Sequence, residues 1–128
     1  MAHNLGANLD HLQILYIDFS DGTLDDMHAI IAQSATVITS QPVKSLLLLT
    51  NVHDLAFNPA SAAEMQRYAQ GNEPFVFEAA VLGLDGIKKI VYQTIRKASG
   101  QNMMAFSDIE EAKQWLIERK REHEGQRY

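Results

Sequence analysis

Four short apolar segments alternate along the chain with four longer segments of helical pattern, and this alternation constrains the fold more than any other feature. The short segments are rich in leucine, β-branched and aromatic residues, as is typical of strands; they span residues 14–19, 45–50, 75–82 and 103–106. Parallel strands need a crossover of about a dozen residues or more, which the helical segments supply. We therefore predict an α/β domain with a four- or five-stranded, mostly parallel sheet, about four helices and right-handed crossovers.

Residue types at the expected helix starts support this interpretation. Thr23 and Asn58 are favoured N-cap residues, and Asn58 is followed by Pro59, whose missing N–H costs nothing in a first turn. The segment Ser107–Glu110 has the spacing of a capping box, which predicts Ser107 as the cap of the last helix. Residues 87–98 carry the clearest apolar stripe at helical spacing, with lysine and arginine beside it.

We expect one domain over residues 13–118, because 128 residues fit a single core and no linker or internal repeat interrupts the pattern. Residues 1–12 form an N-terminal segment, in which Leu9–Leu12 could add a short edge strand. Residues 119–128 form a polar C-terminal tail, which we expect to fray beyond the last helical turn.

Composition and charge narrow the class of function. The absence of cysteine excludes disulfides, a thiolate nucleophile and cysteine-based metal sites. A net charge of −5 argues against nucleic acid as a partner, because phosphate binding needs a basic surface. No apolar segment approaches the ~20 residues that span a bilayer, and the N-terminus lacks the pattern of a signal peptide. We therefore expect no membrane insertion and a cytoplasmic location. Basic residues gather after residue 87. Such a division of charge can orient a partner or a second copy of the chain, but solvated helix faces produce it just as easily.

No signature of a nucleotide-binding loop or a serine hydrolase occurs in the chain. Gly83 and Gly86 are a lone glycine pair with the spacing of a turn. A receiver-like phosphoacceptor site is also excluded, because Thr50 stands where an aspartate would end the buried strand. The sequence thus contains no motif that identifies a catalysed reaction, and we expect no cofactor.

Polar residues follow each predicted strand, at the edge of a parallel sheet where ligands bind. They are Asp18, Ser20, Asp21, Asn51, His53, Asp54, Asp85, Ser107 and Asp108. Asp21, His53 and Asp54 could bind a divalent cation or serve as acid and base, which gives the hypothesis of a metal-assisted enzyme with an acidic site at this edge. The same residue types also cap helices and shape turns, whatever the function.

Several blocks of the sequence are similar, in this order, to a known fold family. They are the strand 14–19, the leucine-rich strand 46–50 with its loop into Asn58-Pro59, the block 81–89, and Ser99-Gly100 followed by 106–116. In these blocks the chain resembles the SpoIIAA-like group of the STAS (sulfate transporter and anti-sigma-factor antagonist) fold, over about residues 13–118. The resemblance implies an α/β fold and a mostly non-enzymatic role. Some members bind a partner and are switched by serine phosphorylation, and the related CRAL-TRIO fold holds lipids.

In the anti-sigma-factor antagonists the phosphorylated serine opens the second helix, and the matching positions here are Asn58 and Pro59. Proline cannot accept phosphate, so this switch is missing at its own position. Ser61 lies slightly further along, still near the positive end of the helix, where a phosphate would be tolerated. An ordinary first-turn serine is the simpler interpretation of Ser61.

Our leading hypothesis is a small, non-catalytic regulatory or protein-interaction domain that binds a protein partner or a second copy of itself. Its surface would combine the loop after the second strand, the start of the second helix and the basic third helix. The candidate residues are Asn51, His53, Asp54, Asn58, Ser61, Lys88, Lys89 and Tyr92.

A second hypothesis is a carrier of a small apolar or lipid-like ligand, held between the sheet and the helix 87–98. The apolar stripe of that helix and the aromatic residues Phe75, Phe77 and Tyr92 favour this hypothesis. Against it stands the rule that native cores leave few voids. Met65, Tyr68 and Trp115 also lie at helical spacing, where packing in the core explains them.

Overall fold

The computed structural model describes residues 7–9, 14–56, 58–84, 89–90, 92–93, 96–97 and 103–125, with side chains described only between residues 14 and 123. The predictions for residues 10–12, Asp85 and Lys88, and for much of the 87–98 helix, lie outside the described residues.

Five strands form one sheet in the order β1-β2-β3-β4-β5. Four of them are parallel to one another: β2 (Ile14–Asp18), β3 (Leu46–Asn51), β4 (Val76–Leu82) and β5 (Met103–Phe106). β1 (Ala7–Leu9) pairs antiparallel with β2. The α/β class and the mostly parallel sheet are therefore confirmed. The N-terminal strand lies slightly before the expected Leu9–Leu12.

Three α-helices have both ends within the described ranges: α1 (Leu24–Thr39), α2 (Pro59–Asn72) and α4 (Ile109–Gly125). A short 3-10 helix, η1 (Glu73–Phe75), follows α2 and leads into β4. Positions 89–90, 92–93 and 96–97, in the crossover from β4 to β5, are also helical. The helix predicted over 87–98 is described only at those positions.

The N-caps of the first two helices are those that the sequence predicts. Thr23 caps α1 and Asn58 caps α2, each through a reciprocal capping box. At α4 the predicted cap is wrong by one residue: Asp108 Oδ2, rather than Ser107, accepts a hydrogen bond from Glu111 N at 3.0 Å. A carboxylate is a strong acceptor at the positive end of a helix, which explains the preference for Asp108.

α4 extends to Gly125, so residues 119–125 of the predicted polar tail belong to this helix. Two contacts with the sheet hold it. Arg119 Nε donates to Glu78 Oε2 at 2.9 Å, and the ring centroids of His123 and Phe77 are 4.9 Å apart. The polar composition suggested full solvation, but the Arg119 guanidinium pairs with a nearly buried carboxylate of β4.

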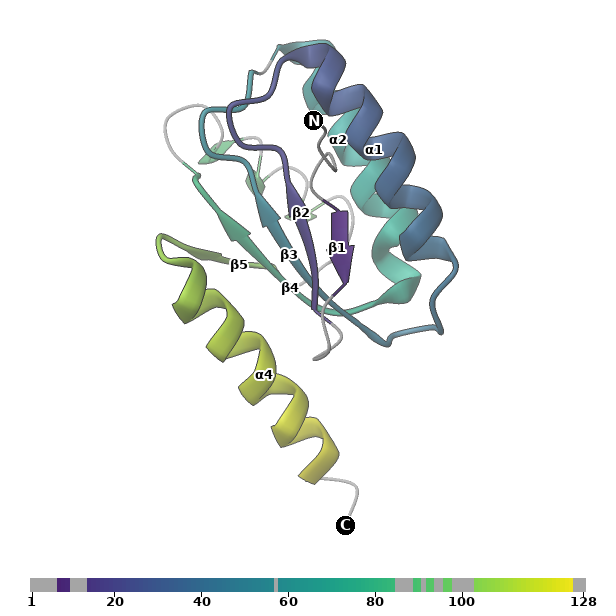
Figure 1. The fold of residues 1–128 in the computed structure, drawn as a ribbon, viewed down its shortest axis with the longest axis vertical. Helices are drawn as coiled ribbons and strands as arrows, with labels where there is room; N and C mark the ends of the chain where they lie inside the picture. The colour runs from purple at the N-terminus through teal and green to yellow at the C-terminus, as the bar shows by residue number, and fades with distance from the viewer. Residues whose placement is uncertain are drawn as a thin grey trace.

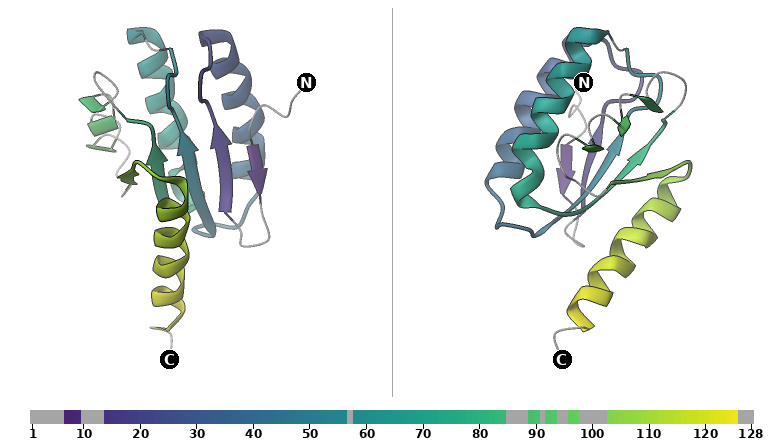
Figure 2. Two further views of the ribbon diagram at one scale, coloured as in Figure 1. Left: turned by 60° about the vertical axis from the view of Figure 1, so that its left-hand side comes forward. Right: turned by 180° about the vertical axis from the view of Figure 1, so that it is seen from behind.

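The helices divide between the two faces of the sheet. Figures 1 and 2 show α1 and α2 side by side on one face, and α4 alone on the other. Right-handed crossovers between parallel strands that follow one another across a sheet place their helices on the same face. α4 follows the last strand and is free of this constraint, so it packs on the opposite face, mainly against β4 and β5.

The leucine run of β3 is buried from both sides. Leu46 and Leu48 belong to the apolar cluster under α1 and α2, whereas Leu47 and Leu49 belong to the cluster under α4. This alternation explains why the strand reads as a continuous apolar segment, as is typical of a parallel strand covered on both faces. The register shifts between Leu46 and Leu47, where β4 carries one extra residue, Phe77.

Candidate functional site

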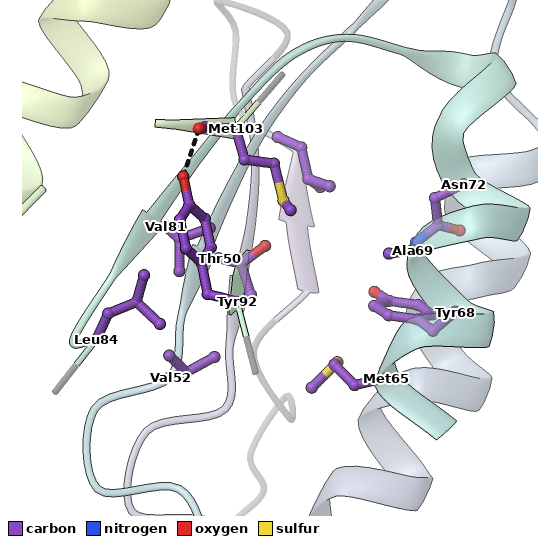
Figure 3. Close-up of a pocket in the computed structure, with 11 residues that line it drawn as sticks. Thr50, Val52, Met65, Tyr68, Ala69, Asn72, Val81, Leu84, Tyr92 and Met103 are labelled. Atoms are coloured by element: carbon purple, nitrogen blue, oxygen red, sulfur yellow. Dashed lines mark hydrogen bonds between the residues drawn. The ribbon is translucent and has the colours of Figure 1, made fainter. Parts of the chain in front are cut away.

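An apolar cavity of about 80 Å³ lies between α2 and the face of the sheet that α1 and α2 cover. Figure 3 shows the side chains of α2 on one side, and those of the sheet with Tyr92 on the other. The lining residues are Leu48, Thr50, Val52, Met65, Tyr68, Ala69, Asn72, Val81, Leu84, Tyr92 and Met103. A single water molecule needs only about 10–15 Å³ of such space, so the cavity has room for a larger group.

Helical spacing and residue size together produce this cavity. Met65, Tyr68 and Asn72 recur every three or four residues along α2, so they share the face turned toward the sheet. Ala69 lies among them and contributes only a methyl group to the wall. On the sheet side, Thr50 is also small. The short side chains on both sides leave a space that their neighbours do not fill.

The two tyrosine hydroxyl groups at the wall of the cavity, on Tyr68 and Tyr92, are hydrogen-bonded within the protein. Ser34 Oγ lies 2.6 Å from Ile30 O and 2.6 Å from Tyr68 OH. Because the single proton of Ser34 serves the carbonyl, Tyr68 donates its own proton to Ser34. Burial raises the pKa of Tyr68 to about 12, against the opposing effect of the Ser34 and Asn72 side chains, so its hydroxyl is neutral near pH 7. The wall therefore offers a ligand mainly apolar contacts.

Tyr92 forms the part of the wall nearest to β5. Its hydroxyl donates a hydrogen bond to Met103 O, which ties the helical part of the crossover to the start of that strand. Burial raises the pKa of Tyr92, with the charge of Arg96 acting in the opposite direction. The phenol therefore stays protonated near pH 7 and keeps its donor role.

A more open recess of about 500 Å³ lies at the carboxyl edge of the strands. We call it the edge recess; its lining residues are His53, Gly83, Leu84, Lys89, Tyr92, Gln93, Ala105, Phe106 and Ser107. This position, beyond the ends of parallel strands, is where ligands bind in open α/β sheets. Four of the residues predicted from the sequence line the recess: His53, Lys89, Tyr92 and Ser107. It also shares Leu84 and Tyr92 with the apolar cavity.

Gly83 permits the close approach of two loops at the edge recess. Its φ is +84°, and a Cβ at this position would lie 2.5 Å from His53 N. Only glycine combines this backbone conformation with so short a contact. On the same side, Val52 N donates to Leu82 O at 2.9 Å. The loop after β3 is thereby held against the end of β4.

The other residues predicted for the site organise the backbone. Asn51 Oδ1 accepts a hydrogen bond from His53 N at 3.0 Å and shapes the turn after β3. Asn58 and Ser61 form the capping box of α2, and Ser61 is buried. Neither Asn51, Asn58 nor Ser61 is among the described lining residues of the two hollows. Lys88 lies outside the described residues.

Asp21, His53 and Asp54 converge, as the hypothesis of a metal site requires. One ligand atom from each lies within 4.8 Å of the others, and all three side chains are exposed. Asp21 and Asp54 both adopt left-handed backbone conformations, with φ of 57° and 54°. Such a set could hold a divalent cation that keeps most of its water ligands. Because the donors are exposed to solvent, water competes strongly for this position.

The structure corrects the prediction that three aromatic residues would lie beside an apolar ligand. Phe75 packs against the cluster under α1 and α2, and Phe77 packs on the opposite face; neither is among the described lining residues of the cavity. Tyr92 alone of the three aromatic residues lines it. The sequence reasoning missed Asn72, whose place on the apolar face of α2 was the available signal. It also missed Leu84, which follows β4 directly.

Comparisons with known proteins identify no relative. No family model matches the chain, and no curated protein or solved structure matches it significantly. Within the described ranges, none of the helices is both long enough and apolar enough to cross a membrane.

Proposed function

We propose that this chain is a non-catalytic cytoplasmic domain of STAS-like fold that binds a small apolar ligand in the cavity beneath α2. The cavity carries the proposal: it lies between α2 and the sheet, its wall is mainly apolar, and the hydroxyl groups of its two tyrosines are already paired. Concave apolar sites with few polar groups are typical of small-molecule binding. The similarity to the SpoIIAA-like group supports a role without catalysis.

The apolar wall of the cavity supports the same conclusion. An apolar ligand that fills the cavity removes this wall from water, and such burial is favourable. It contributes roughly 25 cal/mol per Å² of apolar surface. The ligand would therefore be bound by the contacts that it makes with this wall.

A cavity-filling variant tests the proposal. We expect 1-hexanol, added to ¹⁵N-labelled protein, to shift the amide resonances of Met65, Tyr68 and Val81 in a saturable manner. Ala69→Leu should abolish these shifts, because the added side chain occupies the cavity. Ala63→Leu makes the same change at an exposed position of α2 and should leave them intact. Absence of saturable shifts in the unmodified protein, or equal binding by Ala69→Leu, would contradict the proposal.

A protein-interaction role is the second candidate, and the edge strand β5 favours it. Within the described ranges, β5 pairs only with β4, carries no charged residue and exposes 47% of Met104. Edge strands without charges or proline readily pair with another chain. A second copy of this chain fits such an edge, because an uncharged strand can pair with itself without repulsion.

Sedimentation equilibrium tests this second role. The unmodified chain should be dimeric, and Met104→Lys should make it monomeric. Val43→Lys adds the same charge at an exposed apolar residue, 69% exposed, outside β5, and should leave the dimer unchanged. A monomeric unmodified protein contradicts self-association through β5.

A further inference from the structure

The apolar cavity and the edge recess share two lining residues. Leu84, just after β4, and Tyr92, in the crossover to β5, line both. The Tyr92 hydroxyl is bonded to Met103 O, so at this boundary the side chain presents its ring. The two hollows therefore adjoin at these two side chains, and a molecule that reaches past them would have one end in the cavity and the other in the recess.

The two hollows differ in chemistry. The described lining of the edge recess contains the exposed ammonium group of Lys89 and hydrogen-bond donors on Gln93 and Ser107, but no carboxylate. These groups suit an anion. Asp54 lies beside the recess, with Oδ2 3.3 Å from His53 Nδ1, so His53 already has an acidic neighbour. We therefore expect the anionic group to lie toward Lys89 and Ser107.

The size of the cavity limits the apolar end. A volume of about 80 Å³ corresponds to roughly five to eight groups the size of a water molecule, at about 10–15 Å³ of such space each. The two tyrosine hydroxyl groups in the wall are paired internally, so a polar tail would find few partners. A short alkyl chain fits these conditions better than a long acyl chain or a ring system.

We propose that the ligand is a short-chain amphiphile with an anionic head group. Its alkyl end occupies the apolar cavity, and its carboxylate or phosphate lies in the edge recess near Lys89 and Ser107. This inference rests on the proposed function, because it requires that the cavity accept an apolar group. It adds the chemical class of the ligand and the residue that selects the head group.

Titrations of the ¹⁵N-labelled chain with probes of one tail length test the inference. The probes are 1-hexanol, hexylamine, hexanoate and hexyl phosphate. We expect hexanoate or hexyl phosphate to bind more tightly than the alcohol, and hexylamine to bind least tightly; whichever anion binds more tightly identifies the head group. Lys89→Met should weaken binding of that anion by roughly fivefold, as expected for an exposed ion pair, and leave 1-hexanol unchanged.

Lys97→Met is the matched control, because Lys97 is an exposed lysine of the same crossover outside the described lining of the recess. It should leave the affinity for the anions unchanged. If 1-hexanol binds but the anions bind no more tightly, or if Lys89→Met has no effect on them, the head-group site is wrong and the cavity proposal stands. If none of the probes binds, both proposals are wrong.

Discussion

The Tyr68 hydroxyl of α2 lies 2.6 Å from Ser34 Oγ of α1, and this hydrogen bond joins the two helices at the wall of the apolar cavity. Ser34 is fully buried and also bonds Ile30 O in its own helix. A second interhelical contact, between His28 Nδ1 and Glu64 Oε1 at 2.7 Å, lies at a more exposed position. The cavity thus lies beside a helix pair that is fixed by specific polar contacts.

Ser34→Ala should destabilise the protein by about 1–3 kcal/mol, because it leaves the Tyr68 hydroxyl without its acceptor in a buried position. The double variant Ser34→Ala with Tyr68→Phe should recover part of the loss, since it removes both partners. Urea unfolding measures these differences. Thr36→Ala is the control: Thr36 makes the same kind of bond, to Ala32 O, but on the exposed side of α1. A loss at Ser34 no larger than that at Thr36 would contradict the assignment.

The same tyrosine predicts a change of stability in alkaline solution. The pKa of Tyr68 is raised from 10.0 to about 12 in the folded protein, chiefly by burial. Its contribution to stability is therefore fully present below pH 10 and is lost as the pH rises from about 10 through about 12. We expect this loss to be about 1–3 kcal/mol, given 1.36 kcal/mol per pKa unit and a ring that is only partly buried. Unfolding curves of Tyr68→Phe should show a correspondingly smaller decline. Identical declines in the two proteins would show that Tyr68 ionises freely.

Arg119→Ala should loosen the C-terminal half of α4. The guanidinium bonds both Glu78 of β4 and Glu122 of its own helix, so its removal leaves the nearly buried Glu78 carboxylate without this cation. Amide hydrogen exchange over residues 117–123 should become severalfold faster, while exchange in β3 stays unchanged. Arg121→Ala removes an exposed arginine from the same helix and serves as the control. Equal protection in the two variants would contradict a docking role for Arg119.

The sequence predicts the sheet well because its central parallel strands, such as β3, are largely buried on both faces. Apolar runs such as Leu46–Leu49 then stand out against the helical segments around them. Helix starts are predicted where one residue type dominates the cap, as at Thr23 and Asn58. The end of α4 could not be predicted, because the partner of Arg119 is Glu78, which lies far away in sequence and becomes its neighbour only after the sheet forms.

Of the two hollows, the sequence predicted the location of the edge recess at the carboxyl edge of the strands and, through Tyr92, one lining residue of the apolar cavity. Phe77 was assigned to the wrong face because the register shift in β4 interrupts the alternation of its side chains. A void depends on how several side chains together fail to fill a space, and no single residue signals it. Ala69 of α2 is a common helix residue. Its small side chain contributes to a void only because it lies opposite Thr50 and Val81.

The strand order has a consequence for how the chain reaches this structure. Each strand pairs with the strands next to it in sequence, from β1 through β5. Every strand pairing therefore closes a loop no longer than one crossover. None of these pairings requires a strand that is distant in sequence. Contacts of short sequence separation favour rapid folding. The chain can accordingly add one strand and one crossover at a time, in the order in which a ribosome releases them.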